Sequence, residues 1–107
     1  MGRVETKKII QELRKIKQGA SKKYKIDRIL LFGSRARGEE LLTSDVDVLV
    51  VSPDFTKINF KKRPDFFLDA WRLPVDLEVL CYSPKEFQRK KKELGIVRSA
   101  NKQGLII

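Results

Sequence analysis

Short apolar runs alternate with longer segments that are apolar on one side, and this alternation constrains the fold most. The runs lie at residues 28–32, 45–51 and 75–82, and each is followed by a glycine or by a serine–proline pair. Runs of this length bounded by such residues predict buried strands. Amphipathic segments occupy residues 4–24 and 60–73, a basic helix is expected at residues 84–94, and a short segment follows at residues 96–101. The order of the segments predicts a small mixed β-sheet flanked by helices, in the α/β or α+β class.

The amphipathic segments carry apolar side chains at helical spacing. In the first, from Val4 to Tyr24, isoleucines and a leucine recur on one face and basic residues fill the other. In the segment from Phe60 to Leu73 we interpret the aromatic stripe as core packing, and we expect the phenylalanines to be buried. Ser83 is a predicted N-cap, with Pro84 at the first helical position and Glu86 behind it.

The length and composition are those of one globular domain spanning residues 1–107. The chain of 107 residues supports one modest core, and its hydrophobic fraction of 41% argues against wholesale disorder. No apolar run approaches the length that spans a bilayer, and the first residues, MGRVETKK, lack the apolar core of a signal peptide. We therefore expect a cytoplasmic protein that does not enter a membrane.

The chain has no histidine and a single cysteine, Cys81. These counts exclude a Ser-His-Asp triad, a Cys-His pair and a zinc site built from histidine and cysteine. Cys81 lies in an apolar run and is predicted to be a buried structural thiol. Any catalysis must therefore use carboxylates, basic side chains, hydroxyls, backbone amides or a hard metal ion.

The net charge is +10, from 24 lysines and arginines against 14 aspartates and glutamates. Such an excess favours anionic partners, including nucleotides, nucleic acid or an acidic protein surface. The alternative for any one basic cluster is a solvated exterior.

Gly33 and Ser34 follow the first apolar run directly. Glycine lets the backbone approach a ligand closely, and the serine adds a hydroxyl donor, while Arg35 and Arg37 bring positive charge. These residues are candidates for binding phosphate. Alone the pair is a weak signal, because a Gly-Ser turn after a strand is common.

Asp45 and Asp47 stand at the start of the second apolar run. Residues two apart in a strand point to the same face, so the two carboxylates project together. Their mutual repulsion is relieved by a cation, and Mg²⁺ is the oxygen-preferring ion best suited. The alternative is a polar strand start that faces solvent.

Asp76 and Glu78 alternate with apolar residues in the third run. If this strand pairs beside the second, Asp76 meets Asp45 and Asp47 at one sheet edge, where three carboxylates could hold one or two Mg²⁺ ions. Asp76 could also accept the proton of an attacking hydroxyl. Glu78 is its rival, although a solvent-facing or salt-bridged Glu78 is the favoured interpretation.

Together these residues resemble a known motif. Gly33-Ser34, then residues 35–44, then Asp45-Val46-Asp47 is similar to the Gly-Ser, ten residues, Asp-x-Asp pattern of the DNA polymerase beta superfamily of nucleotidyltransferases. The short chain resembles the minimal nucleotidyltransferases, which are often encoded with HEPN-domain proteins in toxin–antitoxin modules. The likeness covers most of the chain, including the first helix and the strands that carry the motif.

The resemblance implies a polymerase-beta-like fold and a metal-dependent transfer of AMP from ATP, or of another nucleoside monophosphate, to an acceptor. Asp45 and Asp47 would bind Mg²⁺, Asp76 would be the third ligand or the general base, and Gly33 and Ser34 would hold the triphosphate. Arg35 and Arg37 are further candidate phosphate contacts. The implied acceptor is a HEPN-type toxin, with this chain as the antitoxin in a homo- or hetero-oligomer.

Two alternatives stay open. The chain could neutralise its partner by binding alone, without catalysis. It could also be a nucleic-acid-binding or nucleotide-adding domain, which is suggested by the basic clusters at residues 22–25, 61–63 and 89–92. The acceptor, the preferred nucleotide and the oligomeric state are not fixed by the sequence.

Overall fold

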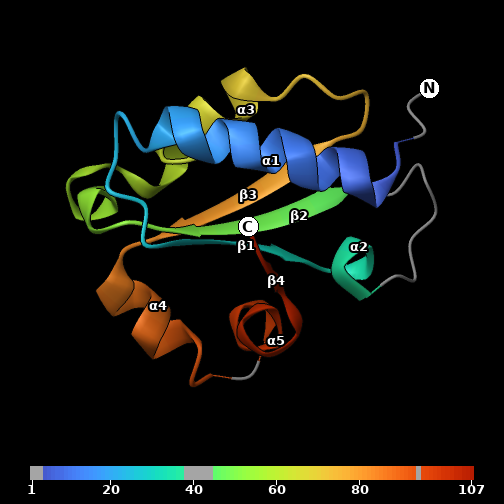
Figure 1. Ribbon diagram of the computed structural model, residues 1–107. Coiled ribbons are helices and arrows are strands. Elements are labelled where there is room, and N and C mark those ends of the chain that lie inside the picture. The colour runs from blue at the N-terminus through green and yellow to red at the C-terminus, as the bar shows by residue number, and fades with distance from the viewer. Residues whose placement is uncertain (1–3, 38–44, 94) are drawn as a thin grey trace.

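Within the residues that the computed structural model describes (4–37, 45–93 and 95–107), four strands form one sheet in the order β3-β2-β1-β4 (Figure 1). They are β1 (Arg28–Phe32), β2 (Val46–Val51), β3 (Leu77–Tyr82) and β4 (Leu105–Ile106). Strand β1 is antiparallel to both β2 and β4, whereas β2 and β3 are parallel. The predicted mixed sheet is confirmed.

Helices cover both faces of this sheet (Figure 1). Helix α1 (Thr6–Ala20) and helix α3 (Asp65–Ala70) lie on one face, and α4 (Pro84–Lys90) and α5 (Ile96–Gln103) lie on the other. The short α2 (Ser34–Arg37) sits at the end of β1. The parallel strands β2 and β3 require a crossover, which here contains the 3-10 turns η1 (Pro53–Lys57) and η2 (Phe60–Lys62) followed by α3.

Two apolar clusters result from this layering, one on each face of the sheet. Successive strand residues point to opposite faces, so Val48 packs under α1 while Leu49 packs under α4 and α5. Both are at most 2% exposed. Burial on both faces explains why the strands have continuous apolar sequences rather than alternating ones.

The segment from Phe60 to Leu73 is not one helix, and this prediction is wrong. The chain forms η2, turns at Arg63 and Pro64, and begins α3 at Asp65. Proline has no N–H to donate within a helix and its ring clashes with the preceding turn, which separates the two pieces. The helix then ends at Ala70, before Pro74, where Trp71 donates its indole N–H to the Val75 carbonyl at 2.7 Å.

Other local predictions are confirmed. Ser83 caps α4 by accepting from the Glu86 N–H at 3.2 Å, and Glu86 accepts from the Ser83 N–H at 2.8 Å, which completes a capping box. Cys81 is buried, and burial raises the pKa of its thiol from 9.0 to about 12, with the Arg63 charge opposing the rise. The thiol is therefore protonated at neutral pH, as a structural cysteine should be.

Candidate active site

Gly33 forms the turn between β1 and α2. Its φ is 75°, a conformation that side chains disfavour, and a Cβ placed there would lie 2.5 Å from Oδ2 of Asp47. Its carbonyl accepts a hydrogen bond from the Ala36 N–H at 3.1 Å, so the chain turns sharply into α2. The absence of a side chain at Gly33 therefore lets the backbone of this turn pack directly on a carboxylate.

Asp47 lies in β2, and Asp45 lies just before it. Asp47 is paired with Phe32 of β1 and is half-buried, whereas Asp45 is exposed. The residues that flank Asp47, Val46 and Val48, point into the cluster under α1. The Asp47 side chain consequently projects to the opposite face, toward α5.

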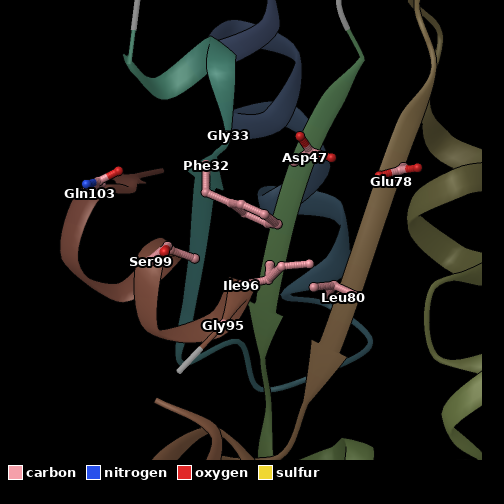
Figure 2. Close-up of a pocket in the computed structure, with 10 residues that line it drawn as sticks. Phe32, Gly33, Asp47, Glu78, Leu80, Gly95, Ile96, Ser99 and Gln103 are labelled. Carbon is pink, nitrogen blue, oxygen red and sulfur yellow. The ribbon is translucent and has the colours of Figure 1, made fainter. Parts of the chain in front are cut away.

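The third strand lies beside the second, as the predicted site requires. The Val46 N–H donates to the Asp76 carbonyl at 2.8 Å, and the parallel register then pairs Asp47 with Glu78. Asp76 and Glu78 are both exposed. Glu78 faces solvent, as we expected, and the register makes it the direct cross-strand neighbour of Asp47 (Figure 2). Among the described residues, no group of three or more carboxylates is already close enough together to hold a metal ion.

Of the two arginines predicted to contact phosphate, Arg35 and Arg37, the structure describes only the side chain of Arg35. Arg35 is 1% exposed, and its Nη1 donates to the Val4 carbonyl at 2.6 Å, so this guanidinium ties α2 to the segment before α1. The side chains of Ser34 and Arg37, and all of residues 38–44, lie outside the described part of the structure.

A cavity of about 540 Å³ opens beside Gly33 and Asp47 (Figure 2). Its lining comes from three strands and from α5, which closes one side. The lining residues are Phe32, Gly33, Asp47, Glu78, Leu80, Gly95, Ile96, Ser99, Ala100 and Gln103. Apolar walls and a few polar groups at the rim are the usual make-up of a small-molecule site. Sequence reasoning missed the α5 residues, because they are near the motif only through the packing of α5 on the sheet.

The sequence and the fold were compared with those of known proteins. Residues 13–104 match the family model described as the nucleotidyltransferase domain. The chain belongs to this nucleotidyltransferase family. Three proteins of Methanocaldococcus jannaschii, provisionally named protein adenylyltransferases, are similar to this nucleotidyltransferase. Their identities are 40%, 40% and 46%, over 71%, 63% and 61% of this chain and 91%, 69% and 67% of theirs.

A solved structure agrees with this assignment. The crystal structure of a protein from Sulfolobus solfataricus, provisionally named a nucleotidyltransferase, matches with a TM-score of 0.63 and 27% identity. The match covers 79% of this chain and 76% of that one. This nucleotidyltransferase is therefore an enzyme, and the predicted family and fold are confirmed. No helix in the described ranges is long and apolar enough to cross a membrane.

Proposed function

We propose that this nucleotidyltransferase transfers AMP from ATP to a hydroxyl group of a partner protein, with Mg²⁺ as its cofactor. The observation that carries the proposal is the packing of the Gly33 turn on Asp47 at the mouth of the cavity. This arrangement provides a backbone surface for phosphate, a carboxylate beside it and an enclosed space for a nucleoside. The relatives named as protein adenylyltransferases support a protein acceptor.

In the proposed reaction, the acceptor oxygen attacks the α-phosphorus of ATP. The bond from that phosphorus to the bridging oxygen of the β-phosphate breaks, and pyrophosphate leaves. Asp76 takes the proton of the attacking hydroxyl, because its exposed carboxylate stands at the edge of the site where an acceptor can approach. Gly33 and Ser34 hold the triphosphate during the transfer, with Arg37 as a further contact.

The donor chemistry of the site fits Mg²⁺, which prefers carboxylate oxygens. Asp45, Asp47 and Asp76 would hold the ion, and Glu78 is a fourth carboxylate within the same pair of strands. When bound, the ion supplies positive charge that orients the triphosphate and offsets the charge developing on it. Asp47 is the best-placed ligand, because the fold already holds its carboxylate against the Gly33 turn.

The cavity is the proposed nucleoside site. Phe32, Leu80 and Ile96 offer apolar surface to a base, while Ser99 and Gln103 of α5 offer hydrogen-bonding groups at the rim. A base placed there leaves the triphosphate at Gly33, so one cavity accommodates both ends of the donor.

The proposed acceptor is a HEPN-type toxin, which this chain would inactivate as the antitoxin. This part of the proposal rests on the resemblance to minimal nucleotidyltransferases. The Cα radius of gyration is 13.2 Å, and the helices lie on both faces of the sheet (Figure 1). We propose that the partner protein or a second copy of the chain contributes to acceptor recognition.

The test is transfer of label from ATP to a candidate HEPN partner in the presence of Mg²⁺. Label in the α-phosphate should appear on the partner, and label in the γ-phosphate should not. Asp47→Asn should abolish transfer, whereas Asp69→Asn, an exposed aspartate of α3 on the other face of the sheet, should leave it intact. Transfer that survives Asp47→Asn would contradict the assigned role, and neutralisation without any transfer would favour a binding-only antitoxin.

A further inference from the structure

Phe60 is exposed, contrary to our expectation that the phenylalanines lie in the core. It is 49% exposed, and its ring lies 5.8 Å from that of Tyr82 at an interplanar angle of 42°. The two rings lie in a shallow cleft of about 330 Å³, whose other lining residues are Glu86, Arg89 and Lys90. An aromatic ring thus lies beside cations on the surface of a basic protein.

This cleft is separate from the candidate nucleoside cavity but adjoins it, because Tyr82 lines the cleft and Leu80, two residues earlier on the same face of β3, lines the cavity. Asp76 precedes β3, whereas Tyr82 ends it, and the six residues of the strand correspond to about 16 Å between its ends. Whatever binds at Phe60 therefore occupies a different place from the nucleotide. An inference about this cleft does not rest on the proposed function.

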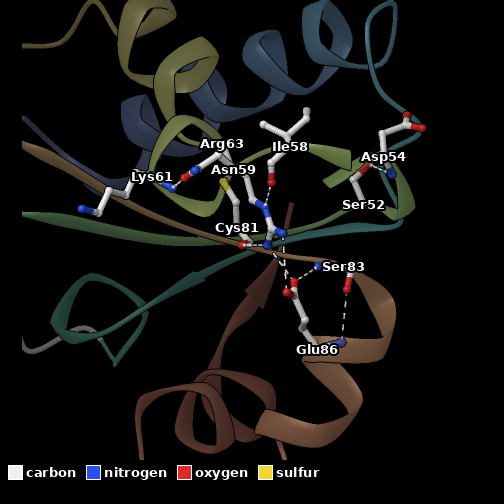
Figure 3. Close-up of polar contacts among 9 residues, drawn as sticks. All are labelled: Ser52, Asp54, Ile58, Asn59, Lys61, Arg63, Cys81, Ser83 and Glu86. Atoms are coloured by element: carbon white, nitrogen blue, oxygen red, sulfur yellow. Dashed lines mark hydrogen bonds and ion pairs between the residues drawn. The ribbon is translucent and has the colours of Figure 1, made fainter. Parts of the chain in front are cut away.

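A buried network fixes the position of Phe60. The Arg63 guanidinium lies 5.4 Å from the centre of the Phe60 ring and is itself held by the carbonyls of Ile58 and Cys81, at 2.9 Å and 3.2 Å. Arg63 is 6% exposed and donates to Glu86 at 2.7 Å (Figure 3). A ring supported in this way is preorganised to bind a flat ligand on its exposed side.

The same network leaves the cleft positively charged. The Glu86 carboxylate is paired with Arg63, which offsets its charge. Arg89 is exposed and Lys90 half-buried, both on the last turn of α4, and Lys61 is exposed next to Phe60. Arg63, which lies against the ring, and Arg89 and Lys90, which line the cleft, come from two basic clusters that are well separated in the sequence.

We propose that this cleft binds a single-stranded nucleic acid, with a base stacked on Phe60 and phosphates bound by Arg89 and Lys90. Unpaired bases expose flat faces that stack on aromatic side chains, and cations beside the ring follow the backbone. A duplex hides its base faces, and an acidic peptide has no flat group that requires the ring. The combination of ring and cations favours a single strand over either.

The test uses fluorescence anisotropy with a labelled oligouridylate of about 12 nucleotides, a length suited to such surfaces. Phe60→Ala should weaken binding about tenfold, and Phe60→Trp should retain it, because indole also stacks. AMP transfer should be unchanged in both variants, since Phe60 does not line the candidate nucleoside cavity. Far-UV circular dichroism and thermal unfolding should show that both variants fold.

Two double variants that remove the same charge distinguish binding at this cleft from nonspecific electrostatic attraction to a basic protein. Arg89→Gln with Lys90→Gln should weaken binding and reduce the slope of log affinity against log salt by about 0.7 for each phosphate that the protein no longer neutralises. Lys7→Gln with Lys8→Gln removes the same charge from exposed positions on α1, across the sheet, and should leave the slope near that of the parent.

Four outcomes would overturn the proposal, three of them measured by direct binding. Those three are equal weakening by the two charge variants, an unchanged affinity in Phe60→Ala, and duplex RNA binding as tight as that of the single strand. Competition by polyglutamate as effective as that by unlabelled oligouridylate would also overturn it, because the surface would then bind acidic polypeptides.

Discussion

At Gly33 the backbone conformation and a neighbouring carboxylate both act against a side chain. A positive φ is strained for any residue with a Cβ, and here that atom would also press on Asp47. The glycine is therefore needed for the local geometry of the site, not only for making a turn. Cys81 and Arg35, by contrast, have chemically active side chains that are buried and contribute to the packing of the interior.

Gly33→Ala should lower the free energy of unfolding by about 1–3 kcal/mol and reduce nucleotidyl transfer, because the turn or Asp47 must shift. Gly19→Ala is the matched control. Gly19 lies inside α1, and a Cβ there would meet only Phe66, at an ordinary 4.0 Å. That change should stabilise the protein by about 0.5–1 kcal/mol. Urea unfolding measures both, and equal effects of the two substitutions would contradict this account.

At the scale of elements, the capping box of α4 is joined to the crossover between β2 and β3. Glu86 accepts from both Ser83 and Arg63, so one carboxylate begins a helix and pairs with a buried guanidinium (Figure 3). Burial acts to raise the pKa of Glu86, but the hydrogen bonds from Arg63 and Ser83 and the charge of Arg63 together lower it. The charged form is therefore favoured by folding.

Glu86→Gln should cost about 1–2 kcal/mol of stability at pH 7, because the amide can still accept from Ser83 but no longer pairs with the Arg63 charge. A lowered pKa gives stability above the ordinary value of 4.5 that is lost as the pH falls through the folded value. The difference between parent and variant should therefore shrink below pH 4.5. Urea unfolding across this range tests it, with the exposed Glu93→Gln as control. A difference that grows toward acid pH would contradict the assignment.

Strands with a continuous apolar sequence could be predicted, whereas elements that form only by pairing with a distant segment could not. The strands around Leu30 and Leu49 are apolar on both faces, so their sequences alone mark them as buried. Strand β4 has two residues and exists because Ile107 donates to the Ile29 carbonyl at 2.9 Å, a hydrogen bond between segments far apart in the sequence. The crossover helix was predicted too long, since Pro64 interrupts an otherwise helical pattern.

At the scale of the whole molecule, the site is assembled from parts far apart in the sequence. The motif residues Gly33, Asp47 and Asp76 could be found locally, because their spacing places them at the ends of predicted strands. The wall formed by Ser99 and Gln103 could not, because it depends on how α5 packs over the sheet. The position of Glu78 opposite Asp47 could not be predicted either, because it depends on the register between β2 and β3.

The wall formed by α5 should contribute to nucleotide binding. Gln103→Ala should raise the KM for ATP by about fivefold, a change consistent with one hydrogen bond, with little effect on kcat. Asn101→Ala is the control, since Asn101 is exposed on the same helix but does not line the cavity. Steady-state kinetics distinguishes the two variants. Identical kinetic constants for both would contradict the placement of the nucleoside in this cavity.

We propose that the Gly33–Asp47 unit activates the α-phosphate of a bound nucleotide. The decisive measurement is the intact mass of the proposed HEPN-type partner after incubation with ATP, Mg²⁺ and either the parent enzyme or Asp47→Asn. The partner should gain one or more AMP groups with the parent enzyme, accompanied by release of pyrophosphate, and should gain none with the variant. An unchanged partner mass with the parent enzyme, or an equal gain with Asp47→Asn, would contradict this proposal.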